Sequence, residues 1–154
     1  MGFQIYRIID SRAAASLAVI EQACFSHPMT ETQIASLMKQ ETSSFFVVCE
    51  ENQGIMVGSA WTQTVLDEGY IGNVGVLPEY RRQGIADALL DALENDAQER
   101  GLAFLTLEVR VSNMPAITLY EKHGYRRAGL RPSYYSDPKE DAILMTKEFE
   151  QKQI

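Results

Sequence analysis

Short apolar or alternating stretches recur along the chain, and segments with helical spacing lie between them. This order is typical of a sheet covered by helices, because strands and helices place apolar residues at different periods. The strand-like stretches are residues 3–9, 45–50, 55–65, 70–76, 103–109, 125–130 and 142–149. The sequence therefore predicts an α/β fold, with a hairpin early in the sheet where the turn-like ENQG separates two strands.

Four segments carry the spacing and end signals of helices. They cover residues 13–24, 31–38, about 85 to 101, and the stretch between 113 and 124. Thr30 and Gln33 form a capping box, in which each side chain satisfies a free backbone N–H. Gly101 and Gly124 are expected to end the last two helices in the left-handed conformation. The first helix has a predicted buried face of Ala14, Leu17, Ala18 and Ala23.

Two glycines, Gly72 and Gly75, lie inside the predicted strand 70–76. Glycine weakens a strand and often marks a close approach of another group to the backbone. A plain β-bulge explains the pair equally well.

Composition narrows the class of protein. A length of 154 residues favours a single domain over 1–154, and 45% hydrophobic with 23% charged residues is typical of a soluble globular protein. The sequence contains no apolar stretch near the roughly 18 residues of a membrane span and no secretory signal, so we expect a cytoplasmic protein. A net charge of −7 argues against nucleic-acid binding and suits a basic peptide partner. The oligomeric state is left open.

A metal site has little support in the sequence. Cys24 and Cys49 lie in unrelated segments, and His27 and His123 are far apart. None of these pairs has metal-ligand spacing, so we expect reduced thiols and no metal.

The stretch VGVLPEYRRQGIA, residues 74–86, passes from a strand through a turn and two arginines to a glycine at a helix start. Free N–H groups and the positive end of the helix dipole favour an anion such as pyrophosphate there. Arg81 and Arg82 would add charge. Taken alone, arginines before a helix more often form a solvated surface.

In context, Arg81, Gly84 and Ala86 resemble the acetyl-coenzyme A signature of the GNAT superfamily of N-acetyltransferases. The resemblance implies a mixed, mostly antiparallel sheet of six to seven strands flanked by about four helices, and acetyl-CoA as the acetyl donor. It also implies a set of donor-binding residues: Val74, Val76, Arg81, Arg82, Gln83, Gly84, Ile85, Ala86, Asn113 and Ala116.

Glu108 is the first candidate catalytic residue. Alternation in the strand 103–109 places Leu107 on one face and Glu108 with Arg110 on the other. A carboxylate in mid-strand either forms an ion pair with neighbouring strands or faces a cleft. Considered without a family, the ion pair is the stronger interpretation.

Tyr120 is the second candidate, although its helical position is equally that of an aromatic core residue. The stretch LTLEVRVSNMPAITLYEKHGY, however, closely resembles the RimI-type alanine acetyltransferases of ribosomal proteins. That resemblance implies that Glu108 is the general base and Tyr120 the general acid. A carboxylate can remove the proton of an attacking amine, and a phenol can protonate the leaving thiolate.

The same resemblance implies an acceptor site. The segment CFSHPMT looks like the family's cleft-lining loop, and the pair YY is followed by an acidic pair and an AI-M strand. In this chain Met29 stands where the family usually has Trp, and Tyr70 where it often has His. The tyrosine pair, placed in a connection before the last strand, could equally cover a sheet edge. The implied acceptor residues are Phe25, Pro28, Met29, Tyr70, Tyr134 and Tyr135.

The implied acceptor is the N-terminal alanine of a basic ribosomal protein. An α-amino group has a pKa of about 8 and lysine about 10.4, so neutralising lysine at pH 7 costs roughly 3 kcal/mol more. This favours α-amine acetylation. Acetylation of a small amine, polyamine or protein lysine remains an alternative, as does a non-catalytic acetyl-CoA-binding module.

Overall fold

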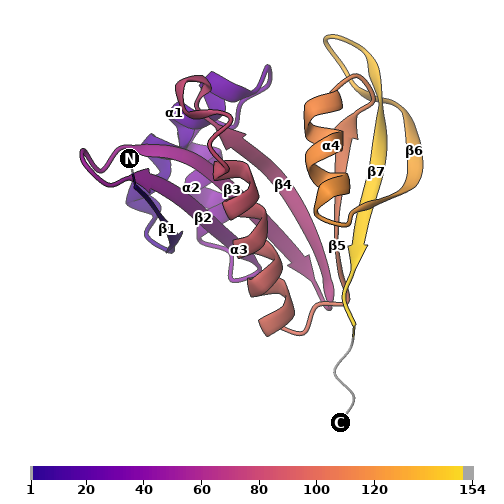
Figure 1. Ribbon diagram of the computed structural model, residues 1–154, viewed down its shortest axis with the longest axis horizontal. Coiled ribbons are helices and arrows are strands. Elements are labelled where there is room, and N and C mark those ends of the chain that lie inside the picture. The colour runs from indigo at the N-terminus through magenta and orange to yellow at the C-terminus, as the bar shows by residue number, and fades with distance from the viewer. Residues whose placement is uncertain (1, 151–154) are drawn as a thin grey trace.

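The computed structural model describes residues 2–150 and forms one seven-stranded sheet in the order β1-β2-β3-β4-β5-β7-β6 (Figure 1). Among the strands of residues 2–150, only β4 and β5 pair in parallel; the other neighbours are antiparallel. The predicted mixed, mostly antiparallel sheet is confirmed. The strands are β1 (Phe3–Ile8), β2 (Ser43–Glu50), β3 (Met56–Val65), β4 (Glu68–Val76), β5 (Phe104–Arg110), β6 (Arg126–Tyr135) and β7 (Glu140–Glu148). The ends of the expected domain, residues 1 and 151–154, lie outside the described part.

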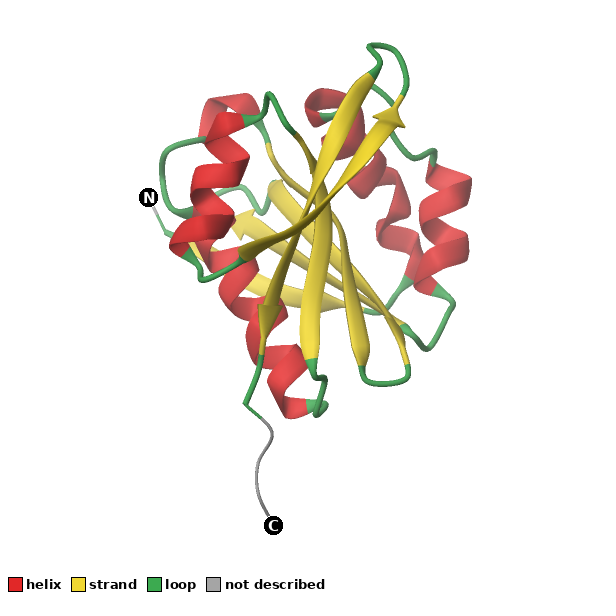
Figure 2. Cartoon of the chain, turned by 90° about the vertical axis from the view of Figure 1, so that its right-hand side faces the viewer, coloured by secondary structure: helices red, strands yellow, loops and turns green. Residues whose placement is uncertain are grey.

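Four α-helices cover the sheet in the described residues 2–150, two on each side, as Figure 2 shows. They are α1 (Ala14–Cys24), α2 (Glu31–Met38), α3 (Ile85–Glu99) and α4 (Met114–Lys122), with 3-10 turns at Ser11–Ala13 and Pro78–Tyr80. Within residues 2–150, none of these helices has the length and apolar character needed to cross a bilayer.

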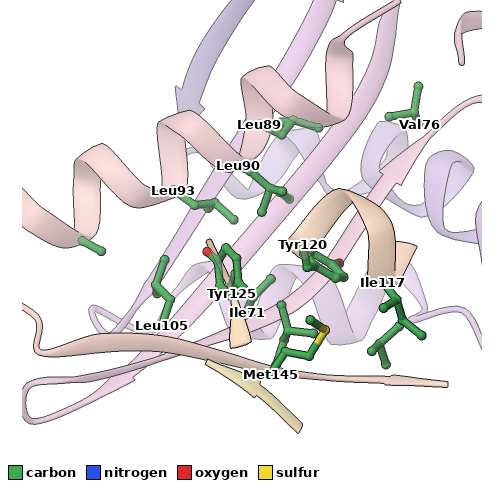
Figure 3. Packing of buried hydrophobic residues seen from close by; sticks show 14 of the residues in the cluster. Ile71, Val76, Leu89, Leu90, Leu93, Leu105, Ile117, Tyr120, Tyr125 and Met145 are labelled. Carbon is green, nitrogen blue, oxygen red and sulfur yellow. The ribbon is translucent and has the colours of Figure 1, made fainter. Parts of the chain in front are cut away.

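The two faces of the sheet carry separate apolar cores. In β2, Phe45 and Val47 pack with α1 and α2, whereas Val48 belongs to the core beneath α3 and α4. Figure 3 shows this second core, with Leu89, Leu90 and Leu93 of α3 on one side and Met145 of β7 on the other. The apolar run in β2 follows from this arrangement, because a strand buried on both faces needs apolar residues at every position.

The local signals in the sequence act as predicted. Thr30 Oγ1 accepts from the Gln33 N–H at 3.2 Å, and Gln33 Oε1 accepts from the Thr30 N–H at 2.9 Å, which completes the capping box. Gly101 and Gly124 have φ values of +74° and +91° at the ends of α3 and α4. Side chains other than glycine rarely adopt this conformation, so both helices end where glycine occurs.

The predicted buried face of α1 is partly wrong. Ala14 and Leu17 are buried, but Ala23 is exposed, and the helix instead buries Ile20 and Glu21. Counting only small and apolar residues missed Glu21, since a carboxylate enters a core only when it finds hydrogen-bond partners.

The boundary of β6 is the second correction. The segment that ends in Tyr134 and Tyr135 was predicted as a connection, but it continues β6 and pairs with β7 as far as Tyr135 opposite Glu140. The pairing is irregular between Arg131 and Tyr135, where Ser133 has a positive φ. Because β7 begins at Glu140, it supplies a partner for a segment whose polar sequence gives no strand signal.

The parallel pair β4 and β5 separates along its length. Pairing runs only from Glu68 opposite Phe104 to Tyr70 opposite Thr106, and beyond it the two strands diverge (Figure 1). On the other edge of β4, the register with β3 shifts next to Gly72. A Cβ at Gly72 would overlap the Trp61 ring, so this glycine marks both a bulge and a close approach.

Candidate active site

A groove of about 620 Å³ lies beside the last residues of β4, beyond the part of β4 that pairs with β5. It runs past the end of β4 and between the first turns of α3 and α4. All the predicted donor-binding residues except Gln83 line it, so the structure brings together two segments that are about 30 positions apart in the sequence. The lining residues are Cys24, Phe25, Val74, Gly75, Val76, Tyr80, Arg81, Arg82, Gly84, Ile85, Ala86, Asp87, Asn113, Pro115, Ala116 and Leu119.

The loop before α3 has the backbone geometry of an anion site. Gly84 is the N-cap of α3 with φ +79°, and Arg82 also has a positive φ of 64°. Gly84 offers no side chain to cap the helix, so the N–H groups of the first turn remain directed at the groove. A Cβ at Gly84 would meet nothing within 4 Å, which shows open space above this turn.

The end of β4 is held against α1 and the loop. The Val76 carbonyl accepts from Arg81 Nε at 3.0 Å and from Cys24 Sγ at 3.3 Å. Burial raises the pKa of the Cys24 thiol, which keeps it protonated and suited to donate. Both lone pairs of this carbonyl are therefore engaged, and Arg81 is fixed beside the groove.

Glu108 lies on β5, two residues beyond the last β4–β5 pair. Its side chain is 23% exposed, and its Oε1 lies 3.2 Å from Arg131 Nε of β6. Its negative charge contributes to raising the pKa values of Tyr70 and Tyr135. The ion pair expected from the sequence alone is present, in a carboxylate that also adjoins two predicted acceptor residues.

Tyr120 is a core residue on α4 with 8% of its surface exposed. Its ring packs edge-on against Tyr125 at a centroid distance of 5.7 Å, and Figure 3 shows both rings between α3 and the sheet. Burial, and then Tyr135, raises the pKa of Tyr120 to about 12. The phenol is therefore protonated at neutral pH, as a hydrogen donor must be.

The predicted tyrosine pair forms an aromatic wall. The rings of Tyr134 and Tyr135 meet edge-on at 5.0 Å, and the guanidinium of Arg110 lies 4.3 Å from the Tyr135 centroid. Arg110 Nη1 also pairs with Glu140 Oε1 at 3.2 Å. Tyr134 is half exposed, so it is the member of the pair that a ligand can reach.

Tyr70 lies at the last position at which β4 and β5 pair. It is 39% exposed, and its hydroxyl donates to Glu68 Oε2 at 3.0 Å. This hydrogen bond is the main reason that the pKa of Tyr70 is raised.

The loop between α1 and α2 meets the turn between β6 and β7. His27 Nε2 lies 3.2 Å from the Ser136 carbonyl and 3.3 Å from that of Asp137. Pro28 and Met29 are half-buried, and Met29 packs against the core of α1 and α2. Phe25, predicted on the acceptor side, lines the donor groove. The two segments implied for acceptor binding therefore form one side of the site together.

Two residues that the sequence analysis missed hold this loop. Glu21 is 3% exposed, and its carboxylate accepts from the Met29 N–H at 2.9 Å. Asn73 Nδ2 in the bulge of β4 donates to both oxygens of Glu21, at 3.1 and 3.0 Å. A glutamate in the mostly apolar run LAVIEQAC was the available signal.

Comparison with known proteins places the chain in a family. Residues 11–125 match the family model of the acetyltransferase (GNAT) family. The chain is 42% identical over 128 residues to the [ribosomal protein bS18]-alanine N-acetyltransferase of Escherichia coli strain K12, covering 82% of this chain and 84% of that protein. The Salmonella typhimurium protein of the same name is 35% identical over 128 residues, with the same coverage.

Solved structures agree with this placement. The crystal structure of the ribosomal-protein-S18-alanine N-acetyltransferase from Escherichia coli superposes with a TM-score of 0.89 at 36% identity, covering 99% of this chain and 97% of that one. Ard1 from Thermoplasma volcanium gives a TM-score of 0.87 at 27% identity, covering 98% of this chain and 100% of that one.

Proposed function

Because the chain belongs to the acetyltransferase (GNAT) family and is an acetyl-CoA-dependent N-acetyltransferase, we propose that it acetylates the N-terminal alanine of ribosomal protein bS18. The observation that carries this proposal is the combination of a relative of that name at 42% identity with a groove lined by the predicted donor residues.

The donor site is proposed to use the main chain before α3. The diphosphate of acetyl-CoA would accept from N–H groups of the loop and first turn, with Arg81 and Arg82 contributing positive charge. Asn113 and Ala116 at the start of α4 line the opposite wall of the groove. The thioester would then lie toward the point at which β4 and β5 separate.

Glu108 is proposed to act as the general base. The acceptor is an ammonium in its resting form and must lose a proton before it attacks the thioester carbon. Glu108 lies beyond the paired part of β4 and β5, and its present partner is Arg131 at 3.2 Å. A cationic acceptor terminus would compete with Arg131 for this carboxylate, so an amine that reaches Glu108 is held next to its base.

Tyr120 is proposed to serve as the proton donor to the coenzyme thiolate. With a pKa of about 12, the phenol is a weaker acid than a thiol of about 8.5, so full transfer in the free enzyme is uphill by roughly 5 kcal/mol. The first contribution of Tyr120 is therefore a hydrogen bond to sulfur as negative charge develops, with transfer following as the product leaves.

The acceptor peptide is proposed to lie between the α1–α2 loop and the β6–β7 hairpin. Tyr70, Tyr134 and Tyr135 offer aromatic surface, and the half-exposed Tyr134 is the nearest to solvent. Glu68 beside Tyr70, together with a net charge of −7, suits a basic peptide.

The decisive test is mass spectrometry of peptides incubated with the full chain and acetyl-CoA. One peptide carries the first residues of bS18 with a free terminal alanine, the second is the same peptide with a blocked terminus, and the third offers lysine as its only amine. We expect acetylation of the first peptide alone. Preferential acetylation of the lysine peptide, or of a polyamine offered beside the peptides, would show that the acceptor is not an N-terminal alanine. An absence of thiol release with every amine would contradict catalysis.

A further inference from the structure

A cluster of ionisable side chains connects α3 to the end of α4, away from the residues assigned to chemistry. Asp87, Asp91 and Glu94 lie on one stripe of α3, since they are spaced by four and three residues. His123 directly follows α4 and faces them. The side chains of His123 and Glu94 are each only 10% exposed.

The two nitrogens of His123 have different surroundings. Nε2 lies 2.8 Å from Asp87 Oδ1, which is hydrogen-bond distance. Nδ1 lies 3.6 Å from Asp91 Oδ1 and 3.7 Å from Glu94 Oε2, which is too long for a hydrogen bond. If Nε2 carries the proton that Asp87 accepts, Nδ1 presents a lone pair to two carboxylate oxygens. That arrangement is repulsive until a cation lies between them.

A second observation also indicates a missing positive partner. Glu94 Oε1 accepts from Lys147 Nζ at 2.8 Å, but its buried Oε2 has no hydrogen-bond partner among residues 2–150. The buried Tyr125 hydroxyl adjoins Glu94, but at a geometry outside that of a regular hydrogen bond. A buried carboxylate oxygen that lacks a hydrogen-bond partner destabilises the fold unless a ligand satisfies it.

We propose that Asp91, Glu94 and His123 bind a divalent transition metal, with Zn²⁺ the best match. The ligand atoms Asp91 Oδ1, Glu94 Oε2 and His123 Nδ1 all lie within 4.8 Å of one another. Zinc bonds of about 2.0–2.1 Å in a tetrahedron place ligands about 3.3–3.4 Å apart. The two carboxylate oxygens already lie 3.6 and 3.7 Å from His123 Nδ1, and the exposed Asp91 side chain can turn to close its distance to Glu94. Imidazole with carboxylates is a ligand set that zinc accepts.

The surroundings support a bound metal. Asp87 accepts from the far nitrogen of His123, which fixes the tautomer that leaves Nδ1 free to bind a metal. Lys122 Nζ lies 2.9 Å from the same Asp87 oxygen and holds that carboxylate in place. Asp91 is 66% exposed, so the fourth position is open to water and the metal has a path of entry.

The metal would tie α4 to α3. Tyr120 lies one turn before His123 on α4, and Asp87 lines the donor groove, so the site adjoins both parts of the catalytic arrangement. Its role would be to hold the two helices that form the walls of the groove. This inference does not depend on the identity of the acceptor.

The test uses the full chain, made without a histidine tag and freed of metal with a chelator. Calorimetry with Zn²⁺ alone and thermal unfolding with and without Zn²⁺ are measured on the native chain and on His123→Gln. His27→Ala is the matched control, because it also removes one imidazole, and Asp91→Asn changes a ligand that is largely exposed. We expect one zinc per chain and a raised Tm for the native chain and His27→Ala, and at least tenfold weaker binding for the other two.

Co²⁺ is the second probe, because its absorption distinguishes nitrogen and oxygen ligands from the thiolates of Cys24 and Cys49. A spectrum without sulfur charge transfer supports the proposed ligands, and a thiolate spectrum overturns them. Equal zinc binding by the native chain and by both variants would also overturn the site. So would an absence of zinc binding by the native chain.

Discussion

Replacing Gly84 by aspartate tests the donor site with little disturbance of the fold. Gly84 has φ +79°, and a Cβ there would meet nothing within 4 Å. The new side chain therefore enters open space above the first turn of α3. Its backbone cost is about 1 kcal/mol, because a left-handed conformation is strained for residues other than glycine. Gly84→Asn has the same shape and a similar strain, so the two variants differ in one negative charge.

The size of the expected effect follows from that charge. A carboxylate about 5 Å from one phosphate charge, at an effective dielectric constant of about 20, is repelled by roughly 3 kcal/mol. Salt at the open groove screens part of this energy, which leaves about 1.5–3 kcal/mol. We therefore expect Gly84→Asp to bind acetyl-CoA about ten- to a hundred-fold more weakly than Gly84→Asn.

Calorimetry of acetyl-CoA binding to both variants and to the native chain measures this difference, and thermal unfolding checks that both are folded. The gap between the two variants should also narrow as salt is added. Equal affinity of Gly84→Asp and Gly84→Asn would refute the assignment of this loop to the diphosphate. A loss of affinity in both would show that shape, not charge, decides binding here.

Three further predictions concern chemistry, acceptor binding and pH. Glu108→Gln and Tyr120→Phe should each lower kcat by about a hundred- to ten-thousand-fold while acetyl-CoA binding stays unchanged. Glu21→Gln weakens the carboxylate that accepts from the Met29 N–H and from Asn73, and should raise the acceptor KM about tenfold with little change for acetyl-CoA. Tyr120 keeps its proton in the folded state up to a pKa of about 12, against about 10 when unfolded, so its contribution is complete below pH 10 and is lost between pH 10 and 12. Chemical denaturation of Tyr120→Phe should accordingly show a flatter loss of stability over that range.

Each of these predictions has a contrary outcome. Near-native turnover of both catalytic variants would remove the base and the acid from the mechanism. An equal rise of both KM values in Glu21→Gln would indicate general loosening instead of a displaced acceptor loop. If the free energy of unfolding fell equally between pH 10 and 12 in the native chain and in Tyr120→Phe, the pKa of folded Tyr120 would be near its ordinary value.

Most of the secondary structure could be predicted because its causes are local. The capping box at Thr30, the terminal glycines of α3 and α4, and the glycine turn before α3 act within a few residues of their own position. The alternating and helical spacing of apolar residues likewise predicted which side of an element would be buried. Where this failed, as at Ala23 and Glu21, the burial of a charged residue depended on distant partners.

The candidate site likewise contains features that depend on local sequence and features that depend on the fold. The sequence by itself determined the backbone of the loop before α3, because free N–H groups at a helix start need only the glycine and the turn that precede it. That this loop binds a diphosphate stays a prediction. The sequence also singled out Glu108 and Tyr120, but their roles stay predictions, since an ion pair and a core position explain both residues in the unliganded fold.

Only the tertiary structure decided which segments distant in the sequence come into contact. The separation of β4 from β5, the bond from Asn73 to Glu21 and the meeting of His123 with Glu94 join residues 29 to 52 positions apart. Such contacts depend on strand order and helix packing, which the local pattern of a sequence does not specify. Two histidines far apart in the chain therefore suggested no metal, and yet the fold brings one of them within reach of two carboxylates on a neighbouring helix.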